Sequence, residues 1–174
     1  MTNLPPLTLV IGGAKSGKSG FAEKLLVENG RPPVYIATAE ARDAEIRNRI
    51  KAHRRMRGDG WRTLEAPRDL SGALAEVNAN EAVLIDCMTF WLSNLMLAGA
   101  DPEAEVQGLF AALSTCGAPV TLVSNELGWS IVPENALARR FRDVHGRLNQ
   151  ELATRADRVA VVISGLPLWL KGGT

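Results

Sequence analysis

The sequence predicts a three-layer α/β domain in which a mainly parallel sheet is flanked by helices. Two observations support this fold class. Five apolar segments typical of strands alternate along the chain with segments of helical spacing. A glycine-rich loop at residues 12–19 lies between the first of these strands and the first helix. Crossovers of this kind are right-handed and place the strands in parallel.

Length, composition and charge limit the possible functions. A chain of 174 residues is expected to form one domain over 1–174 with a sizeable core. The net charge of +1 argues against a nucleic-acid partner, and no apolar run approaches the ~20 residues of a membrane span. Residues 1–6 do not resemble a signal peptide. Cys87 and Cys116 lie in apolar surroundings and are expected to be buried free thiols, which fits a cytoplasmic protein.

The loop matches the phosphate-binding pattern G-x-x-x-x-G-K-[ST] without a mismatch. It follows a β-branched strand at 7–11 and precedes a helix at 20–29, with Gly30 as its stop signal. The alternative is that the match is accidental and the segment is an ordinary glycine-rich turn, but such a turn would not be expected between a buried strand and a helix. We expect backbone N–H groups to surround phosphates, Lys18 to reach the β- and γ-phosphates, and the Ser19 hydroxyl to bind Mg²⁺. The loop consists of Gly12, Gly13, Ala14, Lys15, Ser16, Gly17, Lys18 and Ser19.

The next strand, at 34–37, is expected to end near this loop, because the carboxyl ends of parallel strands share one edge of a sheet. Thr38 could therefore contact nucleotide, or its hydroxyl could cap the following helix. That helix is predicted over 43–56 and carries acid-first i, i+4 ion pairs.

His53 follows Ile46 and Ile50 on one face of this helix, and three arginines come directly after it. A histidine on an apolar face is usually structural, and an arginine run is usually a solvated surface. In a chain that binds nucleotide, the same group could instead act on phosphorus. The imidazole would be the nucleophile, and the guanidinium groups would stabilise charge on the phosphoryl oxygens.

The middle of the chain supplies two carboxylates. Glu65 lies in a short extended piece at 61–67, before a helix predicted at 69–78. The third strand, 82–87, ends with Asp86 in the arrangement of a Walker B motif, so Asp86 could hold Mg²⁺ or could merely cap the next helix. That helix, 89–98, is so apolar that part of it is expected to pack on another subunit.

The remaining segments continue the alternation. A helix at 103–113 begins after Asp101-Pro102, and a fourth strand spans 119–124. An irregular loop at 127–132 carries large apolar residues, as substrate-binding loops often do. A long helix runs from about 135 to 155, the fifth strand covers 158–164, and the residues after Gly165 are interpreted as a tail.

Several runs resemble one known family. They are the phosphate loop, 35–39 (YIATA), His53 within 49–54 (RIKAHR), 124–135 (SNELGWSIVPEN), 138–143 (ARRFRD) and 146–150 (GRLNQ). Together they resemble the bifunctional adenosylcobinamide kinase / adenosylcobinamide-phosphate guanylyltransferases of cobalamin biosynthesis. The similarity covers nearly the whole chain. The phosphate loop is generic, whereas the run from 124 to 143 is highly specific.

The resemblance implies a RecA-like P-loop NTPase fold, a homotrimer and two reactions. ATP or GTP phosphorylates the hydroxyl of adenosylcobinamide, and GMP is then transferred from GTP to adenosylcobinamide phosphate through a guanylylated histidine, here His53. Some relatives carry Glu at the position of Asp86, and some carry a second histidine at that of Ala52. The implied nucleotide contacts are residues 12–19, Ala37, Thr38, Ala39, Arg54, Arg55, Met56, Arg57, Glu65 and Asp86.

Two other functions fit part of the pattern. A P-loop kinase for another small alcohol would use the same loop and leave His53 structural. A nucleotide-dependent switch would bind nucleotide without turnover of cobinamide. The kinase step also needs a base for the substrate hydroxyl, and Glu126 and Asp86 are the candidates because both follow strand ends.

Overall fold

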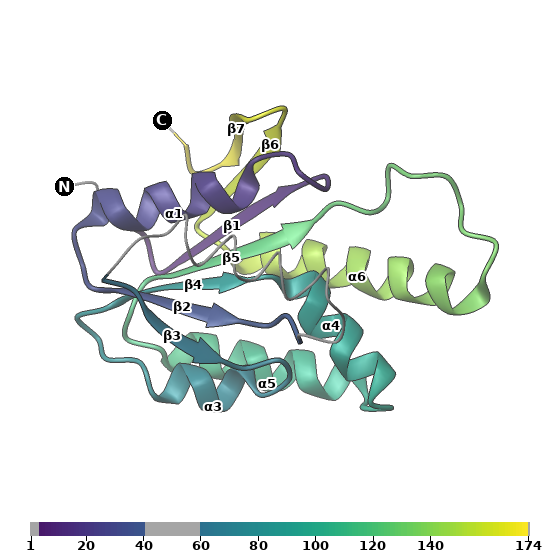
Figure 1. Ribbon diagram of the computed structural model, residues 1–174, viewed down its shortest axis with the longest axis horizontal. Coiled ribbons are helices and arrows are strands. Elements are labelled where there is room, and N and C mark those ends of the chain that lie inside the picture. Colours follow the sequence, from purple (N-terminus) through teal and green to yellow (C-terminus); the bar gives the residue numbers. More distant parts are fainter. Residues whose placement is uncertain (1–3, 41–59, 174) are drawn as a thin grey trace.

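The structure is a computed structural model that describes residues 4–40 and 60–173. Within them, seven strands form one sheet in the order β3-β2-β4-β5-β1-β6-β7 (Figure 1). All neighbours pair in parallel except β6 and β7, which are antiparallel. The strands are β1 (Leu7–Gly12), β2 (Pro33–Ala37), β3 (Arg62–Glu65), β4 (Ala82–Asp86), β5 (Val120–Asn125), β6 (Arg158–Ile163) and β7 (Leu166–Lys171). The helices are α1 (Lys18–Asn29), α3 (Leu70–Ala75), α4 (Met88–Leu97), α5 (Pro102–Thr115) and α6 (Ala136–Arg155).

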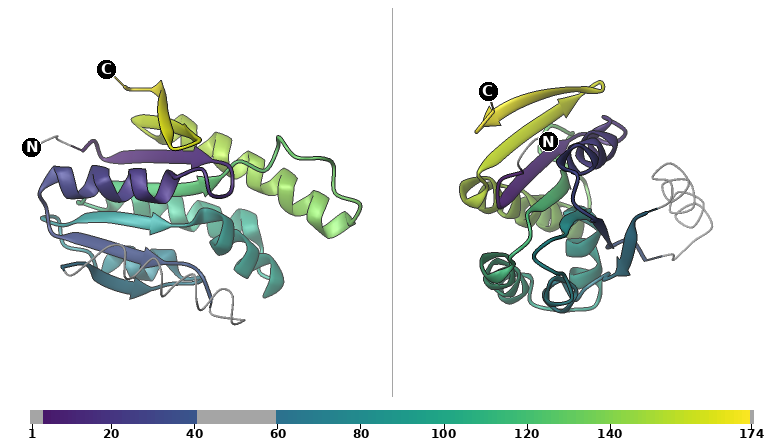
Figure 2. Two further views of the ribbon diagram at one scale, coloured as in Figure 1. Left: turned by 45° about the horizontal axis from the view of Figure 1, so that its top comes forward. Right: turned by 90° about the vertical axis from the view of Figure 1, so that its left-hand side faces the viewer.

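Helices cover both faces of the sheet (Figure 2). α1 packs on one face, where Ala22 and Leu26 meet Val10 and Val123. α3, α4, α5 and α6 cover the other face, where the larger apolar cluster lies. Because residues on a strand alternate between faces, both sides of the central strands are apolar and buried. The predicted three-layer α/β fold with a mainly parallel sheet is confirmed.

The five predicted strands are all present, but the count of five is too low. The extended piece at 61–67 contains β3, which extends the sheet beside β2. The supposed tail forms β7, because Ser164 and Gly165 have positive φ values of 52° and 82° and turn the chain back onto β6. Pro167 is tolerated in β7 because β7 is an edge strand.

Capping residues explain where the helices begin and end. The Asp101 side chain accepts a hydrogen bond from Glu103 N, and the Asn135 side chain accepts from the N–H groups of Leu137 and Ala138. Gly30 ends α1 at a φ of 80°, as predicted. α3 is shorter than the predicted 69–78, because the Glu81 carboxylate accepts a hydrogen bond from the N–H of Asn78.

Most of the apolar surface of α4 packs within the chain itself, and the expectation that part of it packs on another subunit stays a prediction. Trp91, Leu92 and Leu95 are buried within the chain's own core. The indole N–H of Trp91 donates to the carbonyl of Arg68 at 2.7 Å. Leu97, at the end of α4, is the exposed exception among its large side chains. The helix is apolar all round because it lies between the sheet, α5 and α6.

Candidate active site

The phosphate loop is a compact turn between β1 and α1. Lys18 is buried, and its Nζ donates to the carbonyl of Gly13 at 3.0 Å. Two glycines are required here. A Cβ at Gly12 would lie 2.5 Å from the carbonyl oxygen of Val162, and Gly17 has a φ of 95°. Within the described residues, Ser16 Oγ is buried without a hydrogen-bond partner. The loop therefore brings backbone, an ammonium group and a helix N-terminus together, the arrangement that binds phosphates.

Register places the predicted strand-end residues along the same edge of the sheet. Ala37 lies opposite Asp86 on one side and opposite Glu65 on the other. Gly12, where the phosphate loop begins, lies opposite Asn125 of β5. Since these strands are parallel, Ala37, Glu65 and Asp86 share an edge with the phosphate loop.

The donors Ser19 and Asp86 suit Mg²⁺. One hydroxyl and one carboxylate are hard oxygen ligands, and Mg²⁺ usually completes its shell with substrate phosphates and water. Both residues are partly exposed, at the start of α1 and the end of β4 respectively. No group of three or more His, Cys, Asp or Glu side chains that could hold a metal occurs in residues 4–40 and 60–173. One hydroxyl and one carboxylate do not fill an octahedral shell, so the two donors fit a metal whose remaining ligands are nucleotide and water.

Thr38 is fully buried, and its polar groups all have partners within the protein. Its hydroxyl accepts from Cys87 N and donates to Cys87 O, each at 2.7 Å. Its N–H donates to the Asp86 carbonyl, and its own carbonyl accepts from the Asn94 side chain at 2.8 Å. These contacts favour a structural role for Thr38, in which it joins β2 to the end of β4, over direct contact with nucleotide.

The two cysteines are free thiols. Burial and, to a smaller extent, the neighbouring Asp86 charge raise the pKa of Cys87 to about 11. A raised pKa favours the protonated thiol, which is the less reactive form. Cys116 is only half-buried, which corrects the expectation that both thiols are buried.

A buried polar network joins the end of β5 to α4 and α6, and no sequence motif predicts it. The Nε2 atom of His145 lies 3.0 Å from Thr89 Oγ1 and 3.3 Å from Ser124 Oγ. Ser124 Oγ donates to Asn149 Oδ1 at 2.6 Å, which links α6 to β5. His145 and Asn149 are one turn apart on α6, so their i, i+4 spacing is the signal that could have indicated a shared buried face.

The stability of the protein is expected to fall by about 2–3 kcal/mol between about pH 7.5 and 4.5 through His145 alone. Burial lowers the pKa of His145 from 6.5 to about 4. In that interval the unfolded chain binds the proton and the folded chain does not, so this stabilisation is present above 6.5 and is lost toward 4. Urea unfolding of the wild type and of His145→Gln at both pH values measures the difference. Equal losses in the two proteins would contradict the prediction.

The sequence profile of the family described as cobinamide kinase / cobinamide phosphate guanyltransferase matches residues 8–170. The chain belongs to this family. Its members are cobinamide kinases and cobinamide phosphate guanylyltransferases, so the chain is a transferase with a P-loop nucleotide site.

Relatives in the cobinamide kinase / guanylyltransferase family match over almost their whole length. The bifunctional adenosylcobalamin biosynthesis protein CobP of Pseudomonas aeruginosa is 45% identical over 168 residues, which cover 94% of this chain and 96% of that protein. The bifunctional adenosylcobalamin biosynthesis protein CobU of Escherichia coli is 42% identical over 181 residues, covering 95% and 99%. The corresponding protein of Salmonella typhimurium is 43% identical over 183 residues, with the same coverage.

Solved structures with little sequence similarity share the fold. The flagellar accessory protein FlaH of Methanocaldococcus jannaschii is 11% identical with a TM-score of 0.53, over 99% of this chain and 83% of that one. The RadB recombinase is 17% identical with a TM-score of 0.50, over 91% and 75%. These likenesses support the P-loop NTPase fold class.

Some residues that the family resemblance assigns to the site lie outside the described residues. They are His53, Arg54, Arg55, Met56 and Arg57. Ala39 is half-buried just after β2, and Glu65 is exposed at the end of β3. Glu65 also lines a cavity of about 530 Å³ between β3 and α3.

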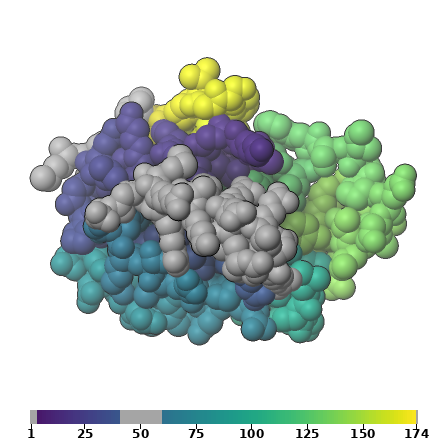
Figure 3. Space-filling view, viewed as in Figure 1, coloured from purple at the N-terminus to yellow at the C-terminus, as the bar shows by residue number. Residues whose placement is uncertain are grey.

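The loop after β5 begins beside the phosphate loop of this family member and then extends away from the sheet (Figures 1 and 3). Glu126 N donates to the carbonyl of Gly12, while the Glu126 carboxylate accepts from Gly128 N at 2.7 Å. Trp129 and Ile131 are 74% and 93% exposed. This loop therefore begins at the edge of the sheet that carries the phosphate loop and presents exposed large apolar side chains farther along.

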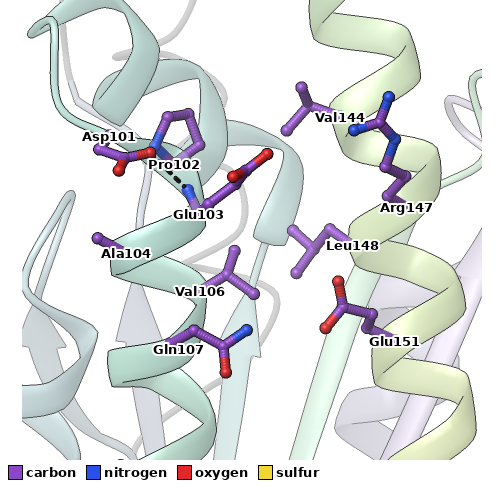
Figure 4. Close-up of a pocket in the computed structure, with 10 residues that line it drawn as sticks. All are labelled: Asp101, Pro102, Glu103, Ala104, Val106, Gln107, Val144, Arg147, Leu148 and Glu151. Carbon is purple, nitrogen blue, oxygen red and sulfur yellow. Dashed lines mark hydrogen bonds between the residues drawn. The ribbon is translucent and has the colours of Figure 1, made fainter.

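A further cavity of about 550 Å³ lies between α5 and α6. Glu103 and Glu151 point into it, over apolar walls that include Val106 and Leu148, and Arg147 lines its edge (Figure 4). None of the residues that line it belongs to the phosphate loop or to a strand end. This cavity is therefore separate from the predicted nucleotide site.

Among the helices of residues 4–40 and 60–173, none has the length and apolar content to cross a bilayer.

Proposed function

We propose that this chain phosphorylates the hydroxyl of the aminopropanol arm of adenosylcobinamide and then transfers GMP from GTP to the new phosphate. The observation that carries the proposal is the shared sheet edge of this family member, at which β1 leads into the loop with Lys18 and Ser19 and β4 ends at Asp86. Phosphoryl transfer needs mainly positioning and charge neutralisation, and these groups supply both.

In the first reaction the substrate hydroxyl attacks the γ-phosphorus of ATP or GTP. The bond from this phosphorus to the β-phosphate oxygen breaks, and a nucleoside diphosphate leaves. Lys18 neutralises charge on the phosphates. Glu126 or Asp86 would accept the hydroxyl proton, since Glu126 N hydrogen-bonds to Gly12 O and Asp86 ends β4 at the same edge of the sheet. Mg²⁺ held by Ser19 and Asp86 would add further positive charge.

In the second reaction the His53 imidazole would attack the α-phosphorus of GTP and release pyrophosphate. An imidazole is largely neutral at pH 7 because its unperturbed pKa is about 6.5, so it is available as a nucleophile. A phosphate oxygen of adenosylcobinamide phosphate then attacks the same phosphorus. The phosphorus–nitrogen bond breaks, and adenosylcobinamide-GDP leaves a free histidine. Arg54, Arg55 and Arg57 would stabilise the negative charge.

Incubation with Mg²⁺ and GTP labelled at the α-phosphate tests this function. We expect an acid-labile, base-stable label on the protein, which adenosylcobinamide phosphate discharges, and phosphorylation of adenosylcobinamide in a parallel assay. Phosphorylation without any label would support the alternative, a kinase for a small alcohol that performs no nucleotidyl transfer. Nucleotide binding without turnover of cobinamide would favour a switch.

We further propose that the exposed loop at 127–132 contacts the corrinoid. The support is its position, because Glu126 N donates a hydrogen bond to Gly12 O at 3.0 Å and the apolar side chains follow directly in the chain.

We also propose a cytoplasmic homotrimer. The exposed Leu166, Leu168 and Leu170 of β7 are an apolar surface that a second subunit would cover.

Trp129→Ser is expected to raise KM for adenosylcobinamide about tenfold or more and to leave KM for the nucleotide within about twofold. An indole that is buried against a ligand contributes about 1.5–3 kcal/mol, and serine loses this contribution. Steady-state kinetics of the kinase reaction measure both constants. Val27→Ser is the matched control, since Val27 is 62% exposed on α1. An unchanged KM for adenosylcobinamide would contradict the proposal that this loop contacts the corrinoid.

A further inference from the structure

Asn125 lies near the middle of the sheet edge that carries the phosphate loop. Its strand, β5, lies between β1, which leads into the phosphate loop, and β4, which ends at Asp86. Asn125 pairs with Gly12, whereas Asp86 pairs with Val123. β5 therefore extends two residues beyond Asp86, and its last residue stands between the two groups that handle phosphate and metal.

The alternation of side chains determines the face on which Asn125 lies. Val123 packs in the apolar cluster under α1, and Ser124 bonds to Asn149 on the opposite face. Asn125 therefore returns to the α1 face. Asp86 lies on the same face, because Leu84, two residues earlier, belongs to the α1 cluster. The phosphate loop leads directly into α1, so all three elements lie on one side of the sheet.

Side chains from two helices hold the backbone of Asn125. Its N–H donates to Thr89 Oγ1 of α4 at 3.0 Å, and its carbonyl accepts from Asn149 Nδ2 of α6 at 2.9 Å. Asn149 is itself fixed by Ser124, and the next N–H, that of Glu126, donates to Gly12 O. The position of Asn125 relative to the phosphate loop is thus determined by buried hydrogen bonds on both sides.

The side-chain amide of Asn125 remains available. Within residues 4–40 and 60–173 it makes no hydrogen bond, and the residue is half-buried. A fixed backbone that carries an unused donor is a pre-organised group, which costs little reorganisation when a ligand binds. A neutral N–H donor at this place complements the ammonium of Lys18, because the transferring phosphoryl group spreads its charge over three oxygens.

We propose that Asn125 is a catalytic residue of the kinase reaction, whose amide donates a hydrogen bond to the γ-phosphoryl group, and that Asn149 is its positioning residue. The inference rests on the proposed function. It assigns Asn125 to the γ-phosphoryl group because Lys18 and Asp86, on either side of it, act at the β- and γ-phosphates.

The test measures kinase kinetics of Asn125→Ala, Asn149→Leu and the double variant, with rates expressed per nucleotide-binding site so that misfolded protein is not counted. We expect Asn125→Ala to lower kcat about 10²-fold with KM for the nucleotide within about threefold, as when one fixed donor to a transition state is removed. Asn149→Leu is expected to lower kcat in the same way. The double variant should be no slower than Asn125→Ala, because Asn149 acts through Asn125.

The matched control is Asn80→Ala. Asn80 is exposed in the turn before β4, at the opposite end of the sheet from the phosphate loop, so its kcat should equal that of the wild type. A kcat of Asn125→Ala within threefold of the wild type would overturn the proposal, as would a raised KM with an unchanged kcat. Independent, additive losses in the double variant would overturn the positioning role of Asn149. A wild-type protein without kinase activity would instead overturn the proposed function.

Discussion

Lys18→Met is expected to lower kcat/KM of both reactions by about 10²–10³-fold, the usual cost of removing one fixed electrostatic contact to a transition state. Lys18 is buried at the start of α1, and its Nζ already lies on the loop, 3.0 Å from the Gly13 carbonyl. Methionine has a similar length but no charge, so the variant loses the ammonium group and its hydrogen bond to Gly13 while keeping most of the side-chain volume.

Steady-state assays of phosphorylation and of GMP transfer measure this loss. Lys24→Met is the matched control, because Lys24 is on the same helix, is 70% exposed and pairs only loosely with Glu28 at 3.7 Å. We expect the control to behave like the wild type, since an exposed ion pair of this kind contributes little. A Lys18→Met enzyme with more than a tenth of wild-type activity in both assays would exclude Lys18 from catalysis.

His53→Asn is expected to abolish the protein label from GTP and to lower GMP transfer by more than about 10³-fold, while phosphorylation of adenosylcobinamide stays within about threefold. The physical reason is that asparagine has no nucleophilic nitrogen, so the covalent intermediate cannot form. The kinase reaction attacks a different phosphorus and does not need the imidazole.

The chain provides its own control for this experiment, because it contains two histidines. His145 is buried and hydrogen-bonded, so His145→Gln should keep the label. Lysine phosphoramidates are also acid-labile, and a label that persists in His53→Asn would therefore assign the intermediate to another side chain. Equal losses of both activities in His53→Asn would indicate a structural role for His53.

The fold class and the phosphate site were predictable from local patterns. The loop motif carries its own context of a strand and a helix, and the apolar strands have lengths and spacings that exclude most alternatives. Edge strands were not predictable in the same way. β3 is only four residues long and β7 has exposed apolar side chains, so neither has the pattern of a buried strand.

The roles of single polar residues depended on contacts that local patterns do not contain. Thr38 follows a strand end, as a nucleotide contact would, yet its hydroxyl is occupied by the backbone of Cys87, 49 residues away. Cys116 has apolar neighbours in the sequence, which predicted a buried thiol, yet it is only half-buried. Burial by distant elements decided both cases.

By itself, the sequence determined a strand, a phosphate-binding motif at 12–19 and a helix, since eight consecutive residues specify a turn, a lysine and a helix N-terminus. Only the tertiary structure decided which residues share that edge. Parallel pairing brings Ala37, Glu65 and Asp86 into one row, and it places Asn125 between the loop and Asp86. The reason is physical: hydrogen-bonded register between strands far apart in the chain sets these neighbours, and no local pattern encodes it.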